Sequence, residues 1–204
     1  MKAIDSAKST GFVRQVRTFT NIVSPPVIYI VLGYAVALSQ RPSVEGFLWG
    51  TLYAFLVALL PLLYVVWLLY TGRIQDINMT KKQRNVPYLV AVLSAALMSA
   101  IVWFGDGPRY LFHLTLLNVI ALGGMGLINL RMQISNHATA IASAMWVSAF
   151  VFDKWIGVML LPVVVVVCAA RLYLKRHTPA QVAAGLALGT VAVMALLLTG
   201  CFGG

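Results

Sequence analysis

The chain has 204 residues, of which 61% are hydrophobic and 10% are charged, and its mean hydropathy is +0.90. These values exclude a soluble globular domain and indicate an integral membrane protein. The formal net charge of +10 must lie in the few segments between the apolar runs. There it can meet lipid headgroups or an anionic substrate, and nucleic acid is the less favoured partner.

Seven apolar runs follow a basic juxtamembrane N-terminus, residues 1–22. A bilayer core of about 30 Å needs roughly 17 to 25 helical residues, and in lipid a helix pairs its own backbone polar groups. We therefore predict an all-α polytopic bundle of about six to seven transmembrane helices, forming a single membrane domain over residues 1–204. The predicted spans are 23–39, 47–71, 87–104, 110–130, 138–152, 155–172 and 181–200.

The fifth run, 138–152, is short enough for a re-entrant or interfacial segment. The residues that follow it, Phe152, Asp153, Lys154 and Trp155, combine charge with aromatic rings as interfacial anchors do. This combination favours a true crossing.

Lys and Arg are divided unequally between the two faces of such a bundle. The richer face would carry Lys2, Lys8, Arg14, Arg17, Arg73, Lys81, Lys82, Arg84, Arg131, Arg171, Lys175 and Arg176, and the other face Arg41, Arg109 and Lys154. Because cytoplasmic loops carry the excess of Lys and Arg, we predict a multi-pass protein of the cell membrane. Its N-terminus and its richer loops would lie in the cytoplasm.

Three polar loops, 72–86, 131–137 and 171–180, are separated by pairs of crossings and so lie on this same face. They can converge at one mouth of the bundle, and they bring His137 and His177 among cations with almost no carboxylates. Zinc would need three or four protein ligands and a hard cation would need oxygen ligands. We therefore expect neither a metal nor another cofactor.

Two histidines in a cationic pocket suit phosphoryl transfer. One imidazole can attack phosphorus, the other can protonate the departing oxygen, and Arg and Lys can neutralise the phosphate oxygens. Ser135 and Asn136 directly precede a predicted helix, so their backbone can add donors to a phosphate. The alternative from the residues alone is that these cations only set topology and contact lipid headgroups.

The same residues carry a resemblance to a known family. Arg171 with His177 six positions later, in the setting A-R-x5-H-T-P, resembles the third signature of the type 2 phosphatidic acid phosphatase (PAP2) superfamily, SRxxxxxHxxxD. The run Ile134 to His137 is similar to its second signature, PSGH, and residues 81–87 loosely resemble the first, KxxxxxxRP. The order of the signatures is kept, and the resemblance covers residues 73–189.

The resemblance implies a metal-independent lipid phosphatase with a six-helix core and a phosphohistidine intermediate. It implies His177 as the nucleophile and His137 as the general acid. Its phosphate-binding cations would be Arg84, Arg171 and one of Lys81 or Lys82. The substrate would be a phosphate monoester or pyrophosphate of a membrane lipid: phosphatidate, phosphatidylglycerophosphate or a polyprenyl (pyro)phosphate.

Gln181 stands where the family has an aspartate four residues after the nucleophile. A carboxamide can accept from the imidazole N–H, so we expect Gln181 to orient His177, but without the negative charge. A bacterial branch of the superfamily has a similar H-T-P-x-Q-V sequence. Ala170, Ile134 and Asn136 also replace the family's serine, proline and glycine.

Two other functions are compatible with parts of the sequence. A catalytically silent PAP2-like protein that binds a lipid phosphate or a partner would explain the neutral Gln181. The loop from Asp76 to Pro87 faintly resembles that of UbiA-type prenyltransferases, which need two Asp-rich motifs for magnesium pyrophosphate. The five acidic residues form no such motif; they are Asp5, Glu45, Asp76, Asp106 and Asp153.

Overall fold

A computed structural model describes residues 11–75 and 79–202, and every regular element in these ranges is a helix. The α-helices are α1 Gly11–Ile22, α2 Pro25–Gln40, α3 Val44–Tyr53, α4 Leu60–Tyr70, α5 Asn85–Phe104, α6 Arg109–Asn129, α7 Asn136–Val151, α8 Lys154–Tyr173 and α9 Pro179–Leu198. A π-helix, η1 Ala54–Leu59, joins α3 to α4 without a break, and a 3-10 helix, η2 Lys82–Arg84, leads into α5. The predicted all-α class is confirmed.

Five helical stretches are long and apolar enough to cross a membrane: Val44–Tyr70, Lys82–Phe104, Arg109–Asn129, Lys154–Tyr173 and Pro179–Leu198. A sixth is reached if α1 and α2, which are bent by 41° at their junction, count together as one span. The remaining predicted crossing corresponds to α7, whose 16 residues are shorter than these stretches. That α7 crosses the membrane, as predicted for residues 138–152, therefore stays a prediction.

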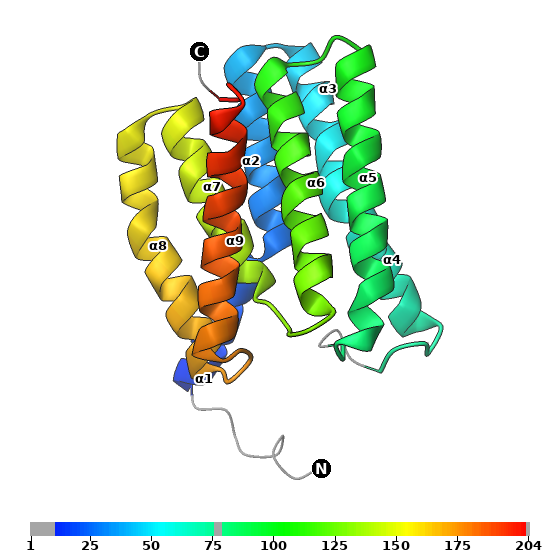
Figure 1. Cartoon of the computed structure of the whole chain (residues 1–204), viewed down its shortest axis with the longest axis vertical. Helices are drawn as coiled ribbons and strands as arrows, with labels where there is room; N and C mark the ends of the chain where they lie inside the picture. Colours follow the sequence, from blue (N-terminus) through cyan, green and yellow to red (C-terminus); the bar gives the residue numbers. More distant parts are fainter. Residues whose placement is uncertain (1–10, 76–78, 203–204) are drawn as a thin grey trace.

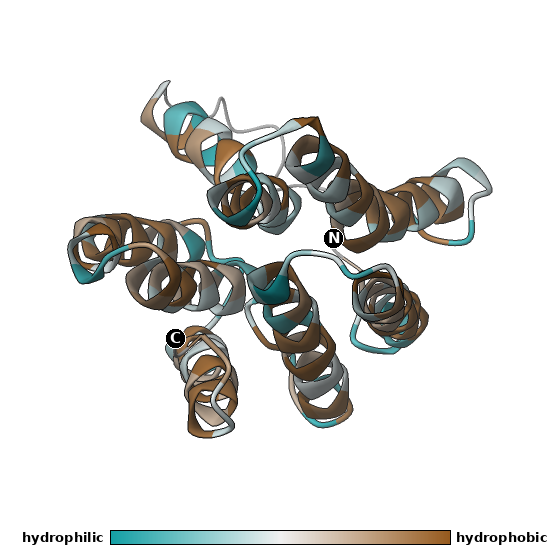
Figure 2. Cartoon of the chain, turned by 90° about the horizontal axis from the view of Figure 1, so that it is seen from above, coloured by the Kyte–Doolittle hydropathy of each residue, from teal (hydrophilic) through white to brown (hydrophobic). Residues whose placement is uncertain are grey.

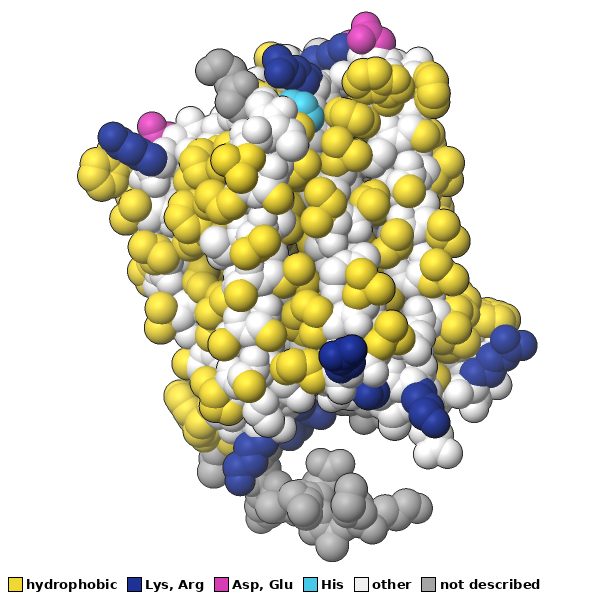
Figure 3. All heavy atoms as spheres, in the orientation of Figure 1, with side chains coloured by type: hydrophobic (Ala, Val, Ile, Leu, Met, Phe, Trp, Pro, Cys, Tyr) yellow, Lys and Arg dark blue, Asp and Glu magenta, His cyan; other side chains and the backbone are white. Residues whose placement is uncertain are grey.

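The helices run up and down as a bundle (Figure 1). Helix α7 packs against α2, α8 and α9, while α5 packs against α6. Viewed along the bundle, the helical ribbons are mainly hydrophobic and the hydrophilic residues gather in connections and at helix ends (Figure 2). On the face seen in Figure 3, hydrophobic side chains are spread over the middle of the surface, as expected where lipid is the solvent.

Two glycines bring α9 unusually close to α7. A Cβ added at Gly185 would come within 2.7 Å of the Ser135 carbonyl oxygen, and one at Gly189 within 2.5 Å of the Thr139 carbonyl oxygen. Small residues allow such close approach of helix backbones. The backbone N–H of Ser135 in turn donates to the Gln181 carbonyl at 3.2 Å. The beginnings of α7 and α9 are therefore fixed side by side.

Capping residues set where these helices begin. The Ser135 hydroxyl accepts from the Ala138 N–H, and the Asp153 carboxylate accepts from the Trp155 N–H. At α9, Thr178 and Gln181 form a reciprocal capping box, with Pro179 in the first turn. Proline is favoured there because its missing N–H is not needed.

Helix α1 was not expected from the apolar runs, because its residues were assigned to the basic juxtamembrane N-terminus. Its sequence, GFVRQVRTFTNI, places apolar residues at helical spacing on one face, while Arg14 and Arg17 are exposed. Such a helix suits the boundary between lipid and water. Residues 1–10, with Lys2, Asp5 and Lys8, lie outside the described residues.

Candidate functional site

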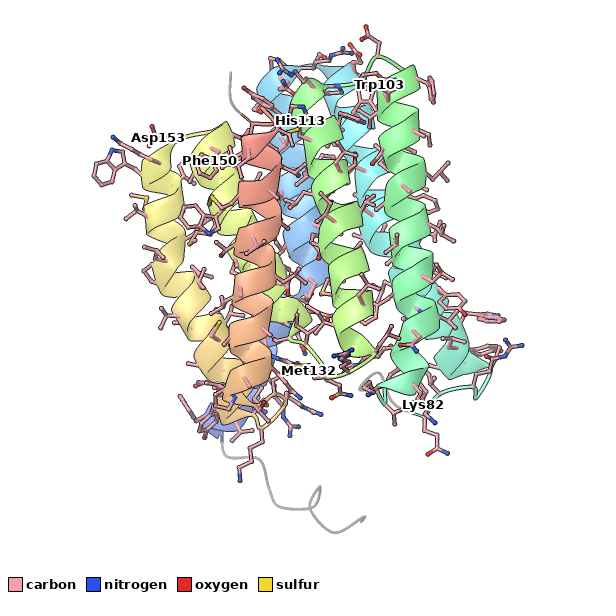
Figure 4. All side chains as sticks on the ribbon, viewed as in Figure 1. Lys82, Trp103, His113, Met132, Phe150 and Asp153 are labelled. Carbon is pink, nitrogen blue, oxygen red and sulfur yellow. The ribbon has the colours of Figure 1, made fainter. Side chains whose placement is uncertain are left out.

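The three polar loops lie at one end of the bundle, as predicted. Figure 4 shows this arrangement, with Lys82 and Met132 at the lower end and Trp103, His113, Phe150 and Asp153 toward the opposite end. His137 and His177 belong to the lower end through α7 and the connection before α9. The third histidine, His113, is therefore remote from this candidate site.

His177 is held by the beginning of α9. Its Nδ1 lies 3.1 Å from Oε1 of Gln181, and that same oxygen accepts the backbone N–H of Thr178 at 3.2 Å. Because an amide N–H can only donate, the Thr178 contact identifies the Gln181 atom as the oxygen. The imidazole therefore donates from Nδ1, and the lone pair of neutral His177 lies on Nε2. No hydrogen bond to Nε2 comes from any residue that the structure describes.

The surroundings of His177 keep its imidazole neutral. Burial lowers the pKa of His177 below its usual 6.5, the hydrogen bond that the ring donates to Gln181 opposes this, and the charges of Arg171 and Arg84 lower the pKa further. Neutral imidazole is the nucleophilic form. His177 also lines a shallow, open depression of about 400 Å³ with Leu172, Lys175, Arg176, Thr178, Pro179 and Gln181.

Arg171 stands in the last turn of α8 with its charge incompletely paired. Its Nε is buried and has no hydrogen-bond partner within the described part of the chain. A buried donor of a charged group that lacks a partner is costly, by about 1–3 kcal/mol or more. This arrangement favours an anion beside Arg171 when a ligand is bound.

Arg84, at the end of η2, lies close enough to act on His177 electrostatically. Its Nε donates to the Met79 carbonyl at 3.1 Å, which fixes the guanidinium near the loop that precedes α5. The Tyr88 hydroxyl also lies beside this guanidinium, whose remaining N–H groups can donate to an anion. Arg84 and Arg171 therefore come together from segments that are far apart in the sequence.

His137 occupies the first turn of α7, near Arg171 and His177. Its Nε2 lies 3.2 Å from the backbone carbonyl oxygen of Thr20 in α1. Because a carbonyl only accepts, Nε2 must carry the proton in this contact. The contact with α1 was not predicted, and it joins residues 117 positions apart.

The two residues before His137 have structural partners. Ser135 is fully buried, and its hydroxyl caps α7 by accepting from the Ala138 N–H. The Asn136 side chain accepts from the Tyr88 hydroxyl at 2.6 Å, which ties α7 to α5. Because the Ser135 backbone N–H already donates to the Gln181 carbonyl, a phosphate contact from this helix beginning would come from the N–H of Asn136 or His137.

The two candidate lysines differ in their surroundings. Lys81 Nζ donates to the carbonyls of Leu130 and Arg131 at 3.0 and 3.2 Å, at the C-terminal end of α6. A cation is stabilised there by the unpaired carbonyls and the helix dipole. Lys82 is exposed on η2. Asn129, the last residue of α6, also links this helix to Lys81, because its side-chain amide donates to the Lys81 carbonyl at 2.8 Å.

Among the residues that the structure describes, no three His, Cys, Asp or Glu side chains gather as a metal site would require. Asp76, which the prenyltransferase alternative uses, lies outside those residues. Comparison of the chain with protein-family models, curated proteins and solved structures found no match.

Proposed function

We propose that the protein is a membrane-embedded, metal-independent phosphatase that removes phosphate from a lipid phosphate monoester or pyrophosphate. The observation that carries this proposal is the arrangement of His177, with Nδ1 bonded to Gln181 and Nε2 unbonded among the described residues, beside the incompletely paired Arg171. A neutral, oriented imidazole next to a phosphate-binding cation is what nucleophilic attack on phosphorus requires. The PAP2-like segments of the sequence support the same function.

In the first step, the lone pair of His177 Nε2 attacks phosphorus and the bond from phosphorus to the lipid oxygen breaks. His137 supplies a proton to that oxygen, and phosphohistidine remains. A monoester releases the lipid alcohol, whereas a pyrophosphate loses its terminal phosphoryl group and releases the lipid monophosphate. As positive charge develops on the imidazole, the Gln181 oxygen accepts a stronger hydrogen bond from Nδ1. Arg171 and Arg84 neutralise the charge on the non-bridging oxygens.

In the second step, water attacks the phosphohistidine and the bond from phosphorus to nitrogen breaks. His137, which lost its proton in the first step, takes one from this water. Inorganic phosphate leaves, and both imidazoles return to their initial states. The cycle consumes one water for each ester bond and needs no external oxidant, reductant or metal.

The contact between His137 and Thr20 constrains the first step. The Nε2 proton of His137 is directed at the carbonyl of α1, and a neutral imidazole that gave up this proton would become a strongly disfavoured imidazolate. His137 must therefore be protonated on both nitrogens to act as the general acid, and it would donate from Nδ1 while Nε2 keeps its contact with Thr20. Burial, and then the charge of Arg171, disfavour this imidazolium in the free protein. We therefore expect His137 to gain its second proton when the anionic phosphate binds.

The lipid would be held with its headgroup at the loop end of the bundle and its tails in the bilayer. We place the protein in the cell membrane, with its N-terminus and the site toward the cytoplasm, from the excess of Lys and Arg on that face. Phosphatidate, phosphatidylglycerophosphate and polyprenyl (pyro)phosphates all present the phosphate group and the apolar tail that this arrangement needs.

A second function, binding of a lipid phosphate without turnover, is favoured by one observation. The side-chain oxygen of Gln181 is already used by the α9 capping box, through the Thr178 N–H. Capping alone therefore explains why glutamine stands at this position. A silent binder would keep Arg171 and Arg84 as anion ligands and would not need His177 to react.

Purified protein in detergent distinguishes the two functions. Phosphate release would be measured from phosphatidate, phosphatidylglycerophosphate and a polyprenyl pyrophosphate in the presence of a chelator. We expect release by the native chain and by His113→Asn, whose histidine lies at the far end, and no release by His177→Ala. Binding of these lipids with equal, background release from the native chain and His177→Ala would favour the silent binder.

A further inference from the structure

An apolar groove runs between α1 and α8, beside the candidate site but not part of it. It encloses about 420 Å³ and is lined by Phe12, Gln15, Val16, Phe19, Val166, Ala169, Ala170 and Tyr173. The small side chains of Ala169 and Ala170 leave space against α8, while Phe12 and Tyr173 meet edge to face with ring centroids 5.5 Å apart. Figure 1 shows α1 beside the lower end of α8.

On both helices, a residue of the candidate site directly follows a residue that lines the groove. On α8, Ala170 is followed directly by Arg171, whose buried Nε lacks a partner among the described residues. On α1, Phe19 is followed by Thr20, whose carbonyl contacts His137. A phosphate placed at Arg171 would therefore have its ester oxygen beside this apolar groove.

Helix α1 has the character needed for the outer wall of a lipid-binding groove. Phe12, Val16 and Phe19 face the groove, while Arg14 and Arg17 are exposed. An amphipathic helix of this kind lies at the membrane interface, with basic residues among the headgroups and apolar residues toward the hydrocarbon. Its groove would thus open at the depth where the tails of lipids begin.

We propose that this groove binds one hydrocarbon tail of the lipid phosphate whose headgroup is held by Arg171. The proposal rests on the proposed function only in placing a lipid phosphate at Arg171, and it holds equally for a phosphatase and for a silent binder. An apolar groove beside a cation whose buried Nε lacks a partner among the described residues matches a lipid that carries both a tail and a phosphate. A neutral bilayer lipid could place a tail in the groove, but it would leave the buried Nε of Arg171 without an anionic partner.

The site can be tested on the full chain in lipid nanodiscs with photoactivatable probes. The first probe is phosphatidate with a diazirine in one acyl tail, the second is a polyprenyl phosphate with the same group, and the third is diacylglycerol with the first probe's tail. After irradiation, labelled residues are located by mass spectrometry of peptides. We expect a phosphate-bearing probe to label residues 12–19 and 166–173, and diacylglycerol to label them much less.

Two substitutions on α8 complete the experiment. Ala169→Trp fills the groove, and we expect it to reduce labelling there by about tenfold, as loss of contact with two CH₂ groups would. Met159→Trp places the same side chain on the outer surface, where Met159 is 77% exposed, and should leave labelling unchanged. Labelling by phosphatidate or by polyprenyl phosphate identifies which tail the groove takes.

Labelling confined to other helices, equal labelling by diacylglycerol, or no difference between the two tryptophan variants would each overturn the tail site. These outcomes are independent of turnover. Groove labelling in a protein that releases no phosphate would support the tail site and reject the phosphatase, whereas phosphate release without groove labelling would do the reverse.

Discussion

Nδ1 of His177 and Oε1 of Gln181 lie 3.1 Å apart, and the same oxygen caps α9 through the Thr178 N–H at 3.2 Å. One carboxamide thus fixes both the beginning of a helix and the orientation of an imidazole. The position of His177 is consequently tied to the folding of α9. What the carboxamide lacks is the negative charge that would stabilise an imidazolium.

Replacing Gln181 with Glu adds that charge at nearly constant shape. We expect Gln181→Glu to raise the pKa of His177 by roughly one to three units, since an opposite charge at hydrogen-bond distance favours the protonated ring. Glutamate also suits this position of a capping box. A titration of His177 followed by NMR would measure the change, and an unaltered or lowered pKa would show that Gln181 does not contact His177 in solution.

The pH dependence of phosphate release follows from the lowered pKa of His177, which burial dominates. The nucleophile must be neutral, so activity is present above this pKa and is lost as the pH falls through it. We expect the protonation of His177 to have no effect on kcat/KM near pH 7. The value of kcat/KM should decline only below about pH 6.5, the usual pKa of histidine. An acid limb above pH 7 in the native chain would contradict this account.

Substitution of Arg171 should lower activity without lowering the stability of the fold. Because its buried Nε has no partner among the described residues, removing the guanidinium relieves an unsatisfied group. We expect Arg171→Gln to lower phosphate release by about 100-fold to 1,000-fold, as for loss of one donor to a transition state. Its melting temperature in detergent should be unchanged or higher, and a clear fall would mean that Arg171 has a structural partner.

A substitution at Gly189 tests how closely α9 must approach α7. A Cβ there would lie 2.5 Å from the Thr139 carbonyl oxygen, so the helices must separate. We expect Gly189→Ala to destabilise the fold by about 1–3 kcal/mol, as overpacking does. Gly123→Ala is the matched control, because a Cβ at Gly123 meets nothing within 4 Å. Equal stability of the two variants by thermal unfolding would refute the close packing.

Lys81 and Lys82 provide a further contrast. Lys81 binds the carbonyls at the end of α6, whereas Lys82 is exposed. We expect Lys81→Met to lower the free energy of unfolding by about 0.3–1 kcal/mol, the usual contribution of a cation at a helix C-terminus. Lys82→Met should have no measurable effect on stability. The opposite order in denaturant or thermal unfolding would place the structural cation at Lys82.

Much of the fold was predictable because the apolar runs are long and are separated by polar residues. The predicted run 155–172 became α8, Lys154–Tyr173, and 181–200 became α9, Pro179–Leu198. The contact of His177 with Gln181 was predictable as well, since a glutamine at the third helical position reaches back to the residues just before the helix.

Features that depend on distant parts of the chain were missed. The contact of His137 with Thr20 joins α7 to α1. Because α1 is polar overall, its residues were assigned to the basic N-terminal segment and the helix was not predicted. The spacing of Phe12, Val16 and Phe19 was the available signal for α1. The partners of Lys81 depend on where α6 ends in space, which no local pattern specifies.

If His177 is the nucleophile, it carries the phosphoryl group between the two steps, and chemical trapping can detect the group there. Native protein, His177→Ala and His113→Asn would be mixed with lipid phosphate radiolabelled at phosphorus and quenched in alkali, where phosphohistidine survives. We expect alkali-stable, acid-labile label on the peptide containing His177 in the native chain and in His113→Asn, and none in His177→Ala. Phosphate release without label on that peptide, or equal label in His177→Ala, would contradict this role of His177.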